Sequence, residues 1–268
     1  MLDAHPEVCI SSPKEPLYFS KNYGLGVDWY EKCFIDNTSA VLVDASPDYS
    51  RGPTDMFPVE NSYDGENFQH IPKRIYEYNP EAKFIYIMRN PISRTYSSYW
   101  HNVRAGYESA TFETCIRQSD RYLVASDYFG QIQNYLEIFE KDQFHFMIFE
   151  KFIRDSSTEL ESCCDFLSIN YMPELSVEKV HKNASYQLNP TAKRMRKLLG
   201  SQKRFKSFSR SLQNVLPERV QIHLKNITTE TIPKIMETDR KYLAELFTER
   251  NAKLEKLTGL DLSIWNEK

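Results

Sequence analysis

The chain has 268 residues and a mass of 31.6 kDa, enough for one large domain with its own core, so we expect residues 1–268 to form a single domain. No apolar run approaches the roughly 18 residues of a membrane span, and no signal peptide is visible at the start. The five cysteines are odd in number and lack metal-ligand spacing, which argues against a disulfide-stapled domain or a metal site and favours the cytosol.

The net charge of −3 is unevenly distributed. Residues 193–225 carry ten Lys and Arg against one acid, Glu218, so this expected helical segment has a charge of +9 and the rest of the chain −12. Such a segment is either a solvated helical face or a basic rim that attracts an anionic cofactor or an acidic glycan. It matches no nucleic-acid-binding module, so we expect no nucleic-acid partner.

Short apolar runs rich in β-formers predict four buried strands, at Val8–Ser11, Ala40–Ala45, Lys83–Met88 and Phe144–Phe149. Between and after them, periodic apolar residues predict helices at Ile71–Tyr78, Pro91–Arg104, Ala110–Ser119, Tyr128–Phe139, Thr158–Leu167 and Thr238–Thr258. Strands that alternate with helices indicate an α/β domain with a parallel sheet.

Two stretches near the start of the chain do not fit this alternation. Met1 to His5 reads as the last turn of a helix that Pro6 stops, without an N-cap or first turn before it. Arg51 to Gln69 is acidic and rich in Pro, Gly and Asn, which predicts a long surface loop that serves as a connection or a lid.

The stretch from Lys83 to Arg104 combines a strand, a sharp turn and a helix. Asn90 is a good N-cap residue. Pro91 is a good first helical residue, because its ring fixes φ near the helical value and it has no backbone N–H that would lack an acceptor in the first turn. A helix N-terminus beyond the carboxyl end of a strand offers N–H groups and a positive dipole end to an anion. Arg89 adds a planar fork that suits phosphate, and Ser97 adds a hydroxyl. The alternative is an ordinary surface arginine on a βα unit.

The run R-N-P-x-x-R-x-Y-S-x-Y from Arg89 to Tyr99 resembles the 3′-phosphate-binding element of sulfotransferases that use 3′-phosphoadenosine 5′-phosphosulfate (PAPS). The resemblance implies a three-layer α/β fold related to P-loop nucleotide kinases, with a central parallel sheet. It also implies that Arg89 and Ser97 hold the 3′-phosphate of PAPS, and later of the 3′,5′-bisphosphate product. Nothing in the sequence requires a metal.

Further residues take their expected roles from the same resemblance to the glycan-sulfating members of the family. Lys14-Glu-Pro-Leu-Tyr-Phe19 is similar to the K-E-P-x-[YF]-F segment that carries their general base, which makes Glu15 the expected base and Lys14 a candidate acceptor contact. His101 stands near a functionally implicated histidine of N-sulfotransferases. Lys182 and Asn183 match a late loop that closes over the nucleotide.

Val-Asp44-Ala-Ser46-Pro-Asp-Tyr49 is similar to the family's E-x-[ST]-P-x-Y segment, with Asp44 in the acidic position. Some glycan sulfotransferases have a lysine directly after the acid, where this chain has Ala45. The sequence therefore keeps the acid of this segment and departs from it at the next position.

One element of the family pattern is absent. In these enzymes a loop K-x-G-[ST]-[ST] follows the first strand and cradles the 5′-phosphosulfate, whereas here Gly24-Leu-Gly26 is followed by Val-Asp-Trp and no other run matches. We expect the chain to lack its natural N-terminus, with the first strand and this loop; a Golgi location would then require an anchor there. The alternatives are a degenerate, non-catalytic nucleotide- or glycan-binding relative and a P-loop kinase, the latter disfavoured because no phosphate loop or magnesium-holding pair is present.

Overall fold

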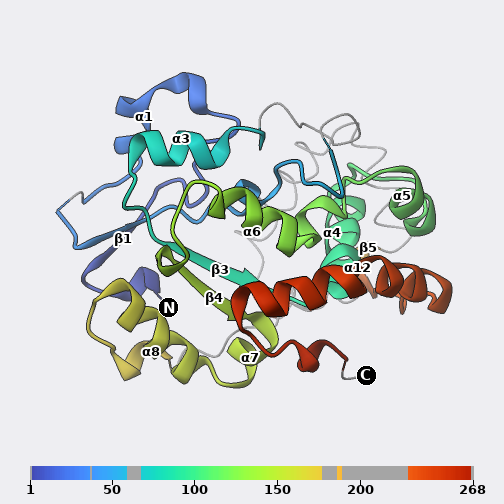
Figure 1. Ribbon diagram of the computed structural model, residues 1–268. Coiled ribbons are helices and arrows are strands. Elements are labelled where there is room, and N and C mark those ends of the chain that lie inside the picture. The colour runs from blue at the N-terminus through green and yellow to red at the C-terminus, as the bar shows by residue number, and fades with distance from the viewer. Residues whose placement is uncertain (1, 37, 59–67, 177–185, 189–228, 267–268) are drawn as a thin grey trace, which may run out of the picture.

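The computed structural model describes residues 2–36, 38–58, 68–176, 186–188 and 229–266 (Figure 1). Its strands are β1 (Val8–Ile10), β2 (Val41–Val43), β3 (Phe84–Met88), β4 (Phe144–Ile148), β5 (Tyr186–Leu188) and β6 (Thr229–Thr231). Its described α-helices are α1 (Val27–Glu31), α3 (Ile71–Tyr78), α4 (Pro91–Ala105), α5 (Phe112–Gln118), α6 (Tyr128–Leu136), α7 (Phe149–Arg154), α8 (Ser156–Leu167) and α12 (Glu237–Thr258). None of the described helices combines the length and the apolar character needed to cross a bilayer.

The four predicted strands are present and form two parallel pairs. β1 pairs with β2, with Val8 opposite Val41, and β3 pairs with β4, with Phe84 opposite Phe144. Among the described strands, β2 and β3 each have one paired edge only. The described strands β5 and β6 form a separate antiparallel pair.

Helices cover both faces of the β3–β4 pair, which makes the domain three-layered (Figure 1). Side chains alternate between the faces of a strand. Phe84, Met88, Phe144 and Ile148 face α3, α6 and α12 in two aromatic and aliphatic clusters. On the other face α8 packs with its cysteines, and Cys163 Sγ lies 3.3 Å from Met147 Sδ. The vicinal cysteines Cys163 and Cys164 are therefore core residues, 3% and 1% exposed.

The same two helical layers cover the β1–β2 pair. Val8, Val41 and Val43 share a cluster with Leu160 and Cys164 of α8. Cys9, on the opposite face, packs into the cluster that holds Phe84 and the α3 side chains. The fold class is thus the expected three-layer α/β arrangement with parallel strands at its centre.

Helix α7 was not predicted, because the chain passes from β4 into it without a break. Its N-cap position is Ile148, the last residue of β4, and no side chain caps it. The apolar run that predicts a strand to Phe149 therefore contains no signal for the turn. By contrast, α12 ends at Thr258 as expected, with Gly259 in the left-handed conformation at φ 79°.

Residues 51–58, the described part of the expected surface loop, pack against α6 with Gly52, Thr54 and Phe57 buried, which corrects that expectation, whereas Asp55 and Pro58 are exposed. Thr54 and Phe57 are 6% and 8% exposed, and Phe68, beyond the undescribed stretch, is 1% exposed. Gln131 of α6 donates to the Gly52 carbonyl at 2.7 Å and accepts from the Gly52 N–H at 3.0 Å. A buried loop needs such partners for its backbone, and the polar face of α6 supplies them.

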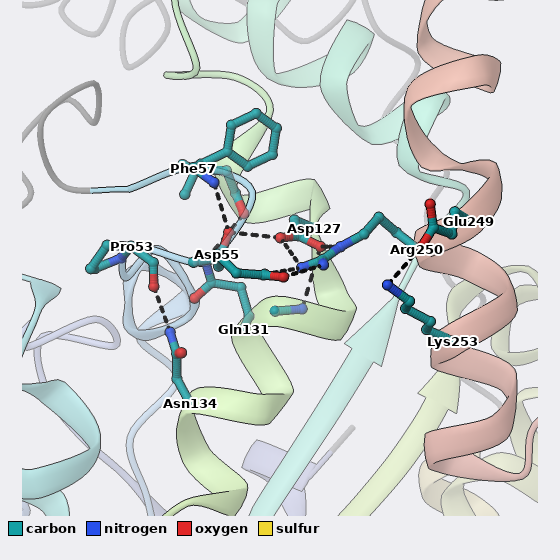
Figure 2. A network of polar contacts seen from close by, with 12 residues as sticks. Pro53, Asp55, Phe57, Asp127, Gln131, Asn134, Glu249, Arg250 and Lys253 are labelled. Carbon is teal, nitrogen blue, oxygen red and sulfur yellow. Dashed lines mark hydrogen bonds and ion pairs between the residues drawn. The ribbon is translucent and has the colours of Figure 1, made fainter.

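A buried charge cluster joins this loop to α12 (Figure 2). Arg250 makes two hydrogen bonds of 2.7 Å to Asp127, the N-cap of α6, and two of 2.9 and 2.7 Å to Asp55. Thr54 Oγ1 donates to Asp127 at 2.8 Å. Burial disfavours the charge on Arg250, but its hydrogen bonds to both carboxylates outweigh burial and raise the pKa of Arg250. Gly130 has no room for a side chain here, since a Cβ would lie 2.5 Å from Asp127 Oδ2.

We expect Arg250→Met to lower the free energy of unfolding by about 3–5 kcal/mol, because it leaves the Asp127 carboxylate, 0% exposed, without its cation. Lys253→Met is the matched control on the same helix. Its 2.7 Å pair with Glu249 is largely exposed and screened by solvent, so its loss should change the stability little. Urea unfolding of both variants measures the difference, and equal losses would contradict a structural role for the buried cluster.

Candidate functional site

The turn between β3 and α4 forms as the sequence predicts. Asn90 caps α4, with its Oδ1 accepting from the N–H groups of Ile92 at 3.0 Å and Ser93 at 3.1 Å. Its Nδ2 donates to the Trp265 carbonyl at 2.8 Å, so the C-terminal tail helps to fix the cap. The hydroxyl of Tyr128 accepts from the Arg89 N–H at 3.1 Å and donates to the Arg89 carbonyl at 2.9 Å. The backbone from which the Arg89 side chain projects is therefore rigid.

Glu150, just past β4, connects the ends of the two strands. Its carboxylate accepts from the Asn90 N–H and from the Trp265 indole, each at 3.0 Å. These two contacts occupy both oxygens, so the acid is a structural support of the turn rather than a free group of the site.

The guanidinium of Arg89 is partly exposed and lies 5.5 Å from the centre of the Phe149 ring. No carboxylate of the described residues lies within ion-pairing distance of it. A stacked guanidinium next to a helix N-terminus keeps its fork of donors for an anion.

The next polar residues of α4 divide into structural and available ones. Arg94 donates to Ser126 Oγ at 3.3 Å, and the buried Thr95 hydroxyl shares that oxygen at 2.9 Å. Ser97 is partly exposed, and no described residue forms a hydrogen bond with its hydroxyl. With a rise of 1.5 Å per residue, Ser97 lies about 10 Å along the helix from the cap. The side chains of Arg89 and Ser97 thus both keep donors for a ligand, one at the start of α4 and the other two turns along it.

His101 lies further along α4, is exposed, and has its Nδ1 3.3 Å from Nη2 of Arg104. The structure places it on the helix that carries Ser97. Its predicted contact with an acceptor stays a prediction.

Glu15 and Lys14 are exposed in the loop after β1. The apolar residues that follow anchor this loop, since Tyr18 and Phe19 are 2% and 4% exposed in an aromatic cluster with Tyr30. Tyr18 stacks on Tyr30 with ring centres 4.5 Å apart. The loop therefore holds its charged residues in solvent and its aromatic residues in the core.

A polar cavity of about 440 Å³ lies beside α4. It is lined by three cationic and four uncharged polar side chains: Lys21, Arg51, Arg121, Ser98, Asn102, Tyr107 and Tyr122. Lys21 and Arg51 both pair with Asp48, at 3.1 and 3.2 Å, and Arg121 donates to Asn102 Oδ1 at 3.3 Å. A cavity with this lining suits an anionic, hydrogen-bonding ligand.

The cavity is lined by none of the predicted site residues Arg89, Ser97, Glu15 and His101. Two of the residues that line the cavity are sequence neighbours of predicted site residues, since Ser98 follows Ser97 and Asn102 follows His101. Sequence reasoning missed its three cations, because they come from three segments and belong to no motif. Lys182 and Asn183, like the basic segment 193–225, lie outside the described residues.

The chain belongs to the sulfotransferase family, since the sulfotransferase domain model matches residues 13–250. It is 27% identical over 201 residues to human heparan sulfate glucosamine 3-O-sulfotransferase 5, covering 69% of this chain and 52% of that protein. It is 29% identical over 188 residues to the human bifunctional heparan sulfate N-deacetylase/N-sulfotransferase 2, covering 63% and 20%. This chain spans about half or less of the length of the first curated relatives it matches.

A solved structure supports the fold. The crystal structure of a sulfotransferase from Alicyclobacillus acidocaldarius superposes with a TM-score of 0.62 at 21% identity, covering 99% of this chain and 91% of that one. The three-layer domain with parallel strands is thus the P-loop-like sulfotransferase fold.

Arg89→Ala should weaken binding of adenosine 3′,5′-bisphosphate by roughly 10- to 100-fold, because a hydrogen bond to a charged group contributes about 1.5–3 kcal/mol. Isothermal titration calorimetry measures the dissociation constant. Arg104→Ala, near the end of the same helix, removes the same charge and should change it less than about twofold. Equal losses in the two variants would point to the general field of the protein and not to a site at Arg89.

Proposed function

We propose that this protein is a PAPS-dependent sulfotransferase that moves a sulfuryl group to a hydroxyl or amine of a carbohydrate. Membership of the sulfotransferase family supports the reaction class. Relatives named as heparan sulfate sulfotransferases support a glycan acceptor. The observation that carries the proposal is Arg89, an arginine without a described carboxylate partner, fixed between the end of β3 and the N-terminus of α4.

The donor side of the proposed site is formed by Arg89 and Ser97. Arg89 would hold the 3′-phosphate of PAPS through its fork of N–H donors, and Ser97 would donate from its hydroxyl. The N-terminus of α4 adds its positive dipole end. No metal takes part in this proposal, because the cationic side chain and the helix end supply the charge for the 3′-phosphate.

Glu15 is the proposed general base. Its carboxylate takes the proton of the acceptor hydroxyl or amine while that oxygen or nitrogen attacks sulfur. The bond between sulfur and the phosphate oxygen breaks, and adenosine 3′,5′-bisphosphate leaves with the electron pair. Correct positioning of acceptor and donor supplies a large part of the acceleration, as in phosphoryl transfer. His101 and Lys14 are the further candidates for contacts with the acceptor.

The polar cavity beside α4, called the cationic cavity here because Lys21, Arg51 and Arg121 line it, is the proposed acceptor site. Lys21, Arg51 and Arg121 favour an acceptor that carries carboxylate or sulfate groups. An apolar acceptor would leave these cations without new partners and gain little from a polar lining. The cavity therefore favours an acidic glycan over a neutral hydrophobic acceptor.

The alternative is a non-catalytic relative that binds nucleotide or glycan. The family's K-x-G-[ST]-[ST] run is not among these 268 residues, so binding and transfer are tested separately. Calorimetry with PAPS and with the 3′,5′-bisphosphate, followed by transfer from radiolabelled PAPS to heparan sulfate, separates the two. Binding without transfer supports the alternative, and transfer supports the enzyme. Transfer to 4-nitrophenol alone would overturn the glycan acceptor.

Glu15→Gln is expected to lower kcat by about 10²–10⁴-fold, because it removes the general base. The affinity for the 3′,5′-bisphosphate should stay unchanged, since the 3′-phosphate is held elsewhere. The exposed Glu31→Gln, in α1, is the matched control and should keep its activity. A Glu15→Gln variant that retains full rate would exclude Glu15 as the base.

Arg51→Gln is expected to raise KM for heparan sulfate roughly tenfold while kcat changes little, because one charge-assisted hydrogen bond contributes about 1.5 kcal/mol. Steady-state kinetics at low and high salt measure this, and the difference between wild type and variant should shrink as salt rises. A KM that is unchanged in the variant would place the acceptor outside the cavity.

A further inference from the structure

The loop that carries Glu15 contains a residue in an unfavourable backbone conformation. Leu17, two positions after Glu15, has φ at 53°, in the left-handed region that residues with a Cβ rarely adopt. A conformation of this kind persists only where surrounding contacts fix it. The contacts on the backbone of residues 17–19 therefore determine the path of the loop.

The carbonyl of Leu17 accepts from Ser20 and Asn22, and that of Phe19 accepts from Arg74. Two hydroxyls from the segment after β2 supply the contacts on the N–H groups of Leu17 and Phe19. Ser46 Oγ accepts from the Leu17 N–H at 3.0 Å, and the Tyr49 hydroxyl accepts from the Phe19 N–H at 3.3 Å. Ser46 is buried, and Tyr49 is partly buried. Two N–H groups on either side of Tyr18 are thus held by side chains that lie about thirty residues further along the chain.

Both hydroxyls are oriented by one carboxylate, Asp44. Its Oδ1 accepts from the Ser46 hydroxyl at 2.6 Å and from the Ser46 N–H at 3.0 Å. Its Oδ2 accepts from the hydroxyls of Tyr49 at 2.6 Å and Tyr30 at 3.2 Å. Because Ser46 and Tyr49 donate their only hydroxyl protons to Asp44, their oxygens remain as acceptors for the loop N–H groups. Each such chain of hydrogen bonds is also strengthened by polarisation.

We propose that Asp44 is a positioning residue for the proposed sulfuryl transfer, which orients Glu15 by fixing the backbone of residues 17–19 through Ser46 and Tyr49. This inference rests on the proposed function and assigns a role to Asp44, which directly follows β2. Asp44 acts through its neighbours and not on the acceptor.

The electrostatics of the cluster agree with this role. Burial raises the pKa of Asp44 above its ordinary value, and the hydrogen bonds from Ser46, Tyr49 and Tyr30 oppose that rise. Burial, together with the charge of Asp44, raises the pKa values of Tyr30 and Tyr49, so both phenols stay protonated and donate. An asparagine at position 44 would turn N–H donors towards one of the hydroxyls, which breaks the directional chain on that side.

The test compares Ser46→Ala and Tyr49→Phe with Tyr30→Phe. The first two remove a contact to the loop backbone, whereas Tyr30→Phe removes a hydrogen bond to Asp44 that does not continue to the loop. We expect Ser46→Ala and Tyr49→Phe to lower kcat roughly tenfold or more, with a smaller effect on KM for heparan sulfate. The dissociation constant of the 3′,5′-bisphosphate should stay within about twofold in all three. Tyr30→Phe should keep kcat, and Ser46→Thr, which retains the hydroxyl, should restore it.

Hydrogen exchange gives a readout that does not depend on activity. The amides of Leu17 and Phe19 should exchange faster in Ser46→Ala and Tyr49→Phe, respectively, and at the wild-type rate in Tyr30→Phe. Unchanged exchange at both amides would overturn the inference, as would faster exchange with an unchanged kcat. A wild-type protein that transfers no sulfuryl group would overturn the proposed function instead, and the exchange rates would still decide whether the network fixes the loop.

Discussion

The pairing of one face of α6 with the backbone of residues 49–54 is the constraint on which the site depends. Four side chains of α6 and its N-cap form hydrogen bonds with this segment. The pairs are Tyr135 with the Tyr49 carbonyl, Gln131 with Gly52, Asn134 with the Pro53 carbonyl and Asp127 with the Thr54 hydroxyl. These α6 positions fall on one side of the helix. A partly buried segment without a strand partner needs other hydrogen bonds for those polar groups that water does not reach. The helix therefore acts as a substitute for a neighbouring strand.

The segment from Asp44 to Phe57 connects the parts of the candidate site because both of its ends are held. At one end Asp44, Ser46 and Tyr49 contact the loop that carries Glu15. In the middle Arg51 reaches the cationic cavity. At the other end Asp55 pairs with Arg250 of α12, which also holds the N-cap of α6. One continuous stretch of chain thus contacts the loop that carries Glu15, the cavity and α12.

The features that could be predicted from the sequence are those with local causes. The cap at Asn90, the proline at the first position of α4 and the end of α12 at Thr258 depend on residues within a few positions, and all three are confirmed. Helix α7 was missed because Ile148 offers no capping side chain. The burial of residues 51–58 depends on Gln131 and Asn134, about 80 positions away, which a composition rich in Pro and Gly cannot reveal. The resemblance to sulfotransferases drew attention to Asp44, but its contacts to Leu17 and Phe19 required the structure.

The number of carboxylates around Arg250, around the pair Lys21 and Arg51, and around Arg89 differs. Arg250, 8% exposed, makes four hydrogen bonds to two carboxylates and so uses four of its five N–H donors within the fold. Lys21 and Arg51 share one acid, Asp48, so their corner of the cavity keeps an excess positive charge. Arg89 has no described carboxylate and only a ring beside it. Partly exposed cations that few acids balance produce a local positive potential, which attracts anions. Two such places, one before α4 and one beside it, agree with the proposed transfer between an anionic donor and an anionic acceptor.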